Sequence, residues 1–135
     1  MTLFKLVFAS TFLFIYPAFA QSGKMERGKY PVEEVARCQE CHTPKLPDGQ
    51  FDKSKWLKGA ALNVQPIEAI ADWHKTSPDL TASSRLWQRW GDAGFVKFLT
   101  TSLAPNGRPA GAPMPMYKVT QEDAEAIVEY LKSLK

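Results

Sequence analysis

The chain has 135 residues, of which 44% are hydrophobic, and its 17 basic side chains outnumber the acidic ones by three. This length and composition suit a single globular domain. The basic residues are scattered along the chain, whereas a nucleic-acid-binding domain usually has a strongly basic face, so nucleic acid is not an expected partner.

The first twenty residues have the pattern of a secretory signal peptide. Lys5 supplies an early positive charge, an uncharged apolar run follows over residues 6–15, and Ala18-Phe19-Ala20 has the small-x-small form of a cleavage site. The uncharged run is too short to cross a bilayer comfortably. We therefore expect cleavage after residue 20 and export to the periplasm without stable membrane insertion. The mature domain would be residues 21–135.

Four segments carry helical signals and strand signals are weak, so the sequence predicts an all-α protein. The first segment runs from Pro31 to Glu40, with proline at the first helical position. A second covers Gln65–Trp73, and a third covers Ser84–Ser102 with a break expected at Gly91-Asp92. The fourth runs from a capping residue at Thr120 to the end of the chain, and its apolar side chains form one continuous stripe.

Cys38, Cys41 and His42 form a Cys-x-x-Cys-His motif, which is the attachment signature of c-type haem. Near the end of a helix, two thiols three positions apart lie on the same side, where each can form a thioether with one vinyl group of a single porphyrin. The histidine that follows projects its imidazole toward the iron. The motif therefore predicts one covalent haem c, tethered through both cysteines, with His42 as an axial ligand.

Other uses of two cysteines at this spacing fit the sequence less well. A disulfide would close a very small loop and would constrain little of the unfolded chain. A thioredoxin-like dithiol needs a βαβ setting that the sequence lacks. A zinc site needs a fourth ligand, which only His74 or carboxylates could supply.

The second axial ligand of the iron can be sought among Met25, Met114, Met116 and His74. Met25 precedes the first predicted helix and lies too near the proximal side. Met114 stands between two prolines in the irregular segment 103–117, and these prolines restrict the loop before it is fixed over a haem. We favour Met114, with Met116 and His74 as alternatives, and we expect His74 to be an exposed loop residue.

These features resemble small mono-haem, class I-type cytochromes c, in particular the single-haem domains of cytochrome subunits of bacterial periplasmic dehydrogenases. The stretch "RGKYPVEEVARCQECHTP" is similar to their opening helix and haem site, and "APMPMYKVTQEDAEAIVEYLKSLK" is similar to their Met-Pro loop and last helix. The resemblance implies the class I cytochrome c fold, with short helices around one haem, and iron binding by the methionine before proline, Met114. It also implies that the first and last helices cross, with Gly28 or Ala36 close to Tyr130 and Leu131.

Finer expectations concern the surroundings of the haem. The aromatic side chains are numerous and are expected to form its wall; they are Trp56, Trp73, Trp87, Trp90, Phe95 and Phe98. A ligating histidine usually donates its second ring N–H, and the carbonyl of Pro44 or Pro47 is the expected acceptor for His42. Thr81 is a candidate for contact with a haem propionate, and a turn or capping role for Asp79 and Thr81 is the alternative.

The sequence thus predicts a periplasmic one-electron carrier whose iron cycles between ferric and ferrous states. We see no general base or nucleophile constellation, so we do not expect an enzyme. The expected partners are other redox proteins, such as a dehydrogenase, an oxidase or another cytochrome, which would meet a monomer or weakly associated subunit in a small, transient contact. Three alternatives stay open: a subunit of a dehydrogenase or oxidase complex, a haem enzyme such as a peroxidase, and a ligand-binding sensor with an open iron site.

Overall fold

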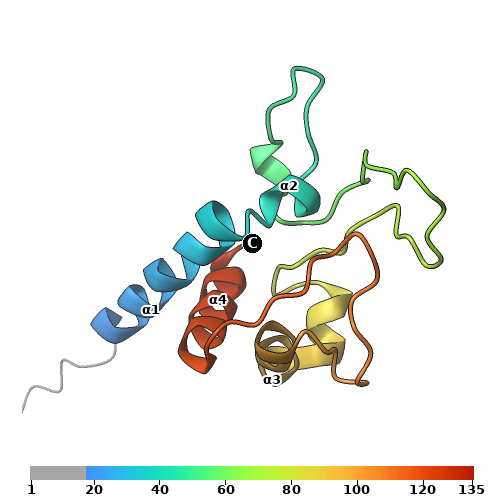
Figure 1. Ribbon diagram of the computed structural model, residues 1–135. Helices are drawn as coiled ribbons and strands as arrows, with labels where there is room; N and C mark the ends of the chain where they lie inside the picture. Colours follow the sequence, from blue (N-terminus) through green and yellow to red (C-terminus); the bar gives the residue numbers. More distant parts are fainter. Residues whose placement is uncertain (1–17) are drawn as a thin grey trace, which may run out of the picture.

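The computed structural model describes residues 18–135, where the regular elements are helices and the extended pairings are isolated bridges (Figure 1). The elements are α1 (Ala18–Tyr30), a π-helical turn (Pro31–Val35), α2 (Gln39–His42), a 3-10 turn (Lys53–Lys55), α3 (Arg85–Thr101) and α4 (Gln121–Ser133). The all-α prediction is confirmed. None of the helices in this described part of the chain is both long and apolar enough to cross a membrane. The predicted signal peptide, residues 1–20, falls almost wholly outside the described residues.

The first predicted helix, Pro31–Glu40, has the wrong bounds. The helical run begins at Ala18 and continues through Pro31 into the π-helical turn. Proline has no N–H to donate, and the chain passes it in a wider turn, in which the Ala36 N–H donates to the Pro31 carbonyl at 2.8 Å. Arg37 then takes a left-handed φ of 50°, which ends this run before α2 begins. Pro31 therefore lies inside a helical run and does not start one.

The helix predicted over Gln65–Trp73 does not form. Its apolar side chains do not pack against the other helices, since Ile67 is fully exposed and Ile70 is 49% exposed. The segment is a loop that is closed at its base by a bridge between Ala61 and Thr76. A short amphipathic stripe that buries nothing does not offset the cost of ordering a helix.

α3 is broken where the sequence predicts. The Ser84 hydroxyl caps its start by accepting a hydrogen bond from the Trp87 N–H at 3.0 Å, and Gly91 interrupts the helix with φ 58° and ψ −179°. The Asp92 carboxylate then accepts hydrogen bonds from Trp87 Nε1 at 3.2 Å and from Lys132 Nζ at 2.8 Å. One carboxylate therefore joins the two halves of α3 to each other and to α4.

α4 begins where the sequence predicts, after Thr120. The Thr120 hydroxyl accepts from the Asp123 N–H at 3.2 Å and lies 2.9 Å from the Asp123 carboxylate, to which it donates. This cap satisfies the Asp123 N–H, one of the donors that a helix start leaves without partners, and the bond between the two side chains holds the hydroxyl in place. The buried face of α4 consists of Ala124, Ala126, Ile127, Val128, Tyr130 and Leu131.

α1 and α4 lie side by side (Figure 1), and their backbones meet at Gly28. A Cβ atom at Gly28 would lie 1.9 Å from the carbonyl oxygen of Ala126, so this approach requires glycine. Of the two residues that the resemblance suggested, Gly28 makes a close backbone contact with α4. The contact on α4 is at Ala126, one helical turn before Tyr130, where the contact was expected.

Substitution of Gly28 by alanine should weaken the fold. We expect Gly28→Ala to lower the free energy of unfolding of the haem-loaded protein by about 1–3 kcal/mol, because the added methyl group forces the two helices apart. Gly23→Ala is the matched control, since a Cβ on this exposed glycine of α1 would meet nothing within 4 Å. The control should be neutral or stabilising by up to about 1 kcal/mol. Equal effects of the two variants in chemical denaturation would contradict the close contact.

Loss of the Asp92 carboxylate should weaken the fold in a pH-dependent way. We expect Asp92→Ala to cost about 1 kcal/mol at neutral pH, because the buried Trp87 Nε1 loses its acceptor. The hydrogen bond from Lys132 holds the pKa of the Asp92 carboxyl below its usual range. A lowered pKa in the folded state stabilises the fold above the unfolded-state pKa of about 4, and this contribution disappears as the pH falls toward the folded-state pKa.

Thermal unfolding should therefore separate Asp92→Ala from the native protein at pH 7, and the difference should shrink as the pH falls below about 4. Glu68→Ala, which removes a carboxylate from the exposed loop, serves as the control and should leave both values unchanged. A deficit of Asp92→Ala that is constant with pH would show that the carboxylate charge does not contribute.

Candidate haem site

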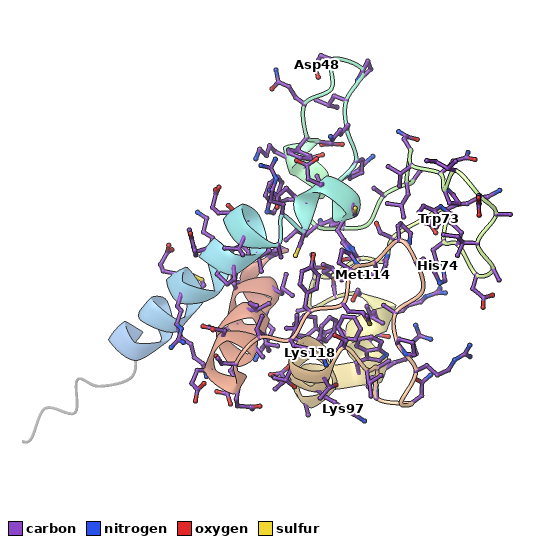
Figure 2. All side chains as sticks on the ribbon, in the orientation of Figure 1. Asp48, Trp73, His74, Lys97, Met114 and Lys118 are labelled. Carbon is purple, nitrogen blue, oxygen red and sulfur yellow. The ribbon has the colours of Figure 1, made fainter. Side chains whose placement is uncertain are left out.

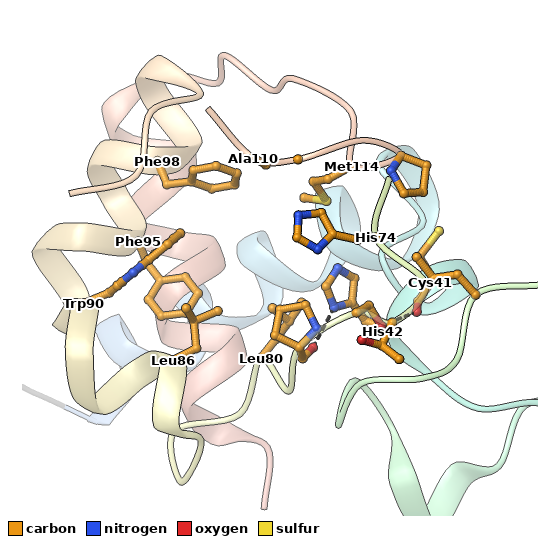
Figure 3. A pocket seen from close by; sticks show the side chains of 16 residues that line it. Cys41, His42, His74, Leu80, Leu86, Trp90, Phe95, Phe98, Ala110 and Met114 are labelled. Carbon is orange, nitrogen blue, oxygen red and sulfur yellow. Dashed lines mark hydrogen bonds between the residues drawn. The ribbon is translucent and has the colours of Figure 1, made fainter. Parts of the chain in front are cut away.

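A cavity lies between α2, α3 and two irregular segments, residues 62–80 and 103–119 (Figure 3). Its empty space is about 830 Å³, part of it open to solvent. α3 contributes Leu86, Trp90, Phe95 and Phe98. The walls are mostly apolar, and their polar side chains are Cys41, His42, His74, Thr76 and Ser77. A space with flat aromatic walls and few polar groups suits a large, planar, apolar cofactor.

His42 is buried at the end of α2 and faces this cavity. Its Nδ1 lies 2.8 Å from the carbonyl oxygen of Pro78, and because a carbonyl only accepts, Nδ1 carries the proton. Nε2 is then free to bind a metal ion. Burial lowers the pKa of the imidazole, which keeps the ring in the neutral form that metal binding requires. The acceptor expected from the sequence was wrong: the Pro44 carbonyl instead accepts from the Asp52 N–H.

The two cysteines lie on the same helical turn as His42. Cys38 is the N-terminal cap of α2, and its carbonyl accepts from the His42 N–H at 2.9 Å. Both cysteines are free thiols and partly buried, and Cys41 lines the cavity. Burial raises the pKa of the Cys38 thiol to about 11. Residues 18–135 hold no cluster of three or more histidine, cysteine and carboxylate groups, so the zinc interpretation lacks its ligands.

The structure places Met114 on the cavity and Met116 away from it. Met114 lines the same space as His42 (Figure 3), whereas Met116 is 75% exposed. Met25 packs against the helical core. Among the three methionines considered, only Met114 is therefore in a position to share an iron with His42.

The segment that carries Met114 is anchored at its C-terminal end. The Ser102 hydroxyl donates to the Tyr117 carbonyl, and the Val119 N–H donates to the Leu99 carbonyl at 3.0 Å. The Tyr117 hydroxyl lies 3.3 Å from the Ala36 carbonyl, just before the cysteine motif. These bonds hold the segment across the cavity, between α3 and the turn that precedes Cys38.

The aromatic part of the wall comes from α3. Three of the predicted wall residues line the cavity: Trp90, Phe95 and Phe98. Trp87 stacks on Phe95, with 4.2 Å between ring centroids, and supports the wall without lining the cavity. Trp56 and Trp73 do not line it either, and Trp73 Nε1 donates to the Val64 carbonyl at 3.2 Å.

Thr81 does not line the cavity, so the expected contact with a propionate is not supported. Its side chain is fully buried, with its hydroxyl 3.1 Å from the Ser83 hydroxyl, and its N–H donates to Asp79 at 2.7 Å. The turn that was the alternative prediction is the observed arrangement. His74, the alternative ligand that we expected to be an exposed loop residue, is exposed and also lines the cavity.

The donor set of this cavity fits a haem. A neutral imidazole, a thioether and the Cys41 thiol line one apolar space, and Cys38, which does not line it, caps the helical turn that ends at His42. This arrangement is compatible with a haem-attachment site in a small helical protein.

Sequence comparison agrees with this assignment, since the profile of the cytochrome c family matches residues 25–135. The chain belongs to the cytochrome c family. Membership implies electron transfer through covalently attached haem c, and the Cys38–His42 spacing is that of the attachment motif.

The chain is also similar to parts of larger bacterial proteins. It is 34% identical over 112 residues to a "Diheme cytochrome c-type" protein of Cereibacter sphaeroides, over 79% of this chain and 34% of that protein. It is 31% identical to the "Fructose dehydrogenase cytochrome subunit" of Gluconobacter japonicus, over 80% of this chain and 21% of the relative. It is 25% identical to a nicotinate dehydrogenase subunit of Pseudomonas putida, over 85% of this chain and 9% of that relative. The chain thus spans about a third or less of each of these relatives.

Thr43 follows the cavity histidine and should stabilise the chain that leaves it. Its hydroxyl accepts a hydrogen bond from the Leu57 N–H at 2.9 Å, and both residues are almost fully buried. Thr43→Val keeps the shape but leaves this N–H without an acceptor, so we expect a loss of about 1–3 kcal/mol in denaturant unfolding. Thr101→Val, the same change at an exposed helical position, should cost less than about 0.5 kcal/mol. A Thr43→Val protein as stable as this control would show that the buried bond is dispensable.

Proposed function

We propose that this protein is an exported, periplasmic one-electron carrier with a single haem c. Cys38 and Cys41 attach the haem, and His42 and Met114 bind its iron. The observation that carries the proposal is that His42 and Met114 line one apolar cavity, with the two thiols on the turn that ends at His42. The sequence has only two cysteines and hence one attachment motif, which supports one haem.

The haem supplies an iron atom that accepts and returns one electron. The Pro78 carbonyl holds the imidazole of His42 in one orientation and one tautomer. The side chains of α3 give the cavity an apolar wall, and an apolar site with a thioether ligand favours the ferrous state. Met114 lies in a segment anchored to α3, so both proposed ligands are held in place before and after electron transfer.

A second candidate function is that of an electron-transfer unit in a dehydrogenase complex. Two relatives are named as a fructose dehydrogenase cytochrome subunit and a nicotinate dehydrogenase subunit, and this chain matches only a part of each. A docked subunit would use the same haem and the same ligands. Co-purification of a dehydrogenase with the native protein at low ionic strength distinguishes the subunit from a free carrier.

The ligand assignment makes a prediction with a built-in control. The exported protein should have the mass of residues 21–135 plus one haem, and its ferric spectrum should show the methionine–iron charge-transfer band. Met114→Ala should abolish this band and allow the ferrous iron to bind carbon monoxide, because the distal position is left open. Met116→Ala, which changes an exposed side chain of the same type two residues away, should change neither property.

Three results would contradict the proposal. A protein mass without haem would show that no haem is attached. Loss of the charge-transfer band in Met116→Ala but not in Met114→Ala would show that Met116 is the iron ligand. Carbon monoxide binding to the native ferrous protein at neutral pH would show an open iron site and favour a haem enzyme or a sensor.

A further inference from the structure

The cavity offers few polar groups to the two carboxylates of a haem. Among the described residues, those that line it include no lysine, arginine, aspartate or glutamate. His42 Nδ1 is bonded to Pro78, and the Ser77 hydroxyl donates to the Cys41 carbonyl at 2.6 Å. Thr76 and Trp90 are neutral donors. His74 is thus the lining side chain, apart from the buried His42, that can carry a positive charge.

His74 lines the cavity near Met114, and its side chain is also exposed to solvent (Figures 2 and 3). It lies at the end of the loop that the Ala61–Thr76 bridge closes, and its N–H donates to the Ala112 carbonyl at 2.8 Å. Its ring lies against Gly111, where a Cβ atom would be 2.2 Å from Nε2. The position of the imidazole is therefore fixed by a backbone bond and by the lack of a side chain at residue 111.

We propose that His74 binds a haem propionate through a hydrogen bond from its imidazole. The inference rests on the proposed haem site and adds to it a residue that recognises the carboxylate edge of the cofactor. A carboxylate beside apolar walls needs a donor, and a donor that can be positively charged is the strongest kind. The His74 N–H is bonded to the carbonyl of Ala112, two residues before Met114. His74 would therefore connect the haem carboxylate to the segment that carries the proposed ligand.

The experiment uses the haem-loaded protein with ¹³C-labelled propionates. It compares His74→Ala and His74→Gln with Lys75→Ala, which removes an exposed positive charge from the adjacent position. We measure the reduction potential and the oxidised-minus-reduced infrared spectrum of the labelled carboxylates. His74→Ala should lower the potential, because a carboxylate without its donor stabilises ferric iron, and it should shift the carboxylate bands. His74→Gln keeps an N–H donor and should fall between His74→Ala and the native protein, whereas Lys75→Ala should resemble the native protein.

Gly111→Ala provides a second perturbation that leaves residue 74 unchanged. The added methyl group would displace the imidazole, so the carboxylate bands should shift in the same direction as in His74→Ala. Agreement of these two variants separates a contact with the cofactor from a general effect of losing a histidine.

Two results would overturn the proposal. One is that His74→Ala and Lys75→Ala give the same potential and the same carboxylate bands. The other is that Met114→Ala shows a bis-imidazole, low-spin spectrum that disappears when His74→Ala is added, because His74 would then reach the iron. Failure of the proposed function is distinguishable, since it appears as missing covalent haem in the native protein's mass, whereas failure here appears with the haem attached and the bands unchanged.

Discussion

The backbone contact between α1 and α4 at Gly28 fixes the frame on which the haem site depends. The π-helical turn follows α1 directly, and α2 with its cysteines comes three residues after that turn. The position of α1 against α4 therefore determines where the attachment motif lies. The Tyr130 hydroxyl adds a second tie between these elements by donating to the Glu33 carboxylate in the π-helical turn. A frame set by backbone contact and short connections leaves the motif little freedom to shift.

The apolar side chains of α3 face the buried core on one side and the cavity on another. Trp87 and Phe95 belong to the buried core, but Phe95 also faces the cavity, together with Trp90 and Phe98. Each square ångström of apolar surface that is removed from water contributes about 25 cal/mol, so a cofactor in this space would supply a large part of the stabilisation of so small a domain. Ligand binding to the folded state alone shifts the folding equilibrium toward it. Folding and haem attachment are for this reason expected to be coupled.

The parts of the structure that local patterns determine were predictable from the sequence, and those that depend on distant contacts were not. The cap at Thr120, the stripe of α4 and the break at Gly91 each depend on residues within a few positions of one another. The acceptor for His42 was missed because Pro78 is 36 residues away, across a loop whose path the sequence does not determine. The stripe over residues 65–73 was misleading because periodicity shows that a segment could bury one face, not that a partner exists. The start predicted at Pro31 was wrong for a related reason. Local rules place proline at the first position of a helix, but here a π-helical turn accommodates it within a helical run that begins earlier.

Residues 74–78 connect the two sides of the cavity. At one end the His74 N–H is bonded to Ala112, in the segment that carries Met114, and at the other end the Pro78 carbonyl is bonded to the His42 ring. Between them the Ser77 hydroxyl donates to the Cys41 carbonyl in α2. One stretch of five residues therefore bonds to the ring of His42, to the helix that bears the second thiol and to the segment that carries Met114. Its two ends bond to the segments of both proposed ligands, so this stretch links their positions. This coupling favours a carrier with fixed ligands over a protein that opens its iron site to substrates.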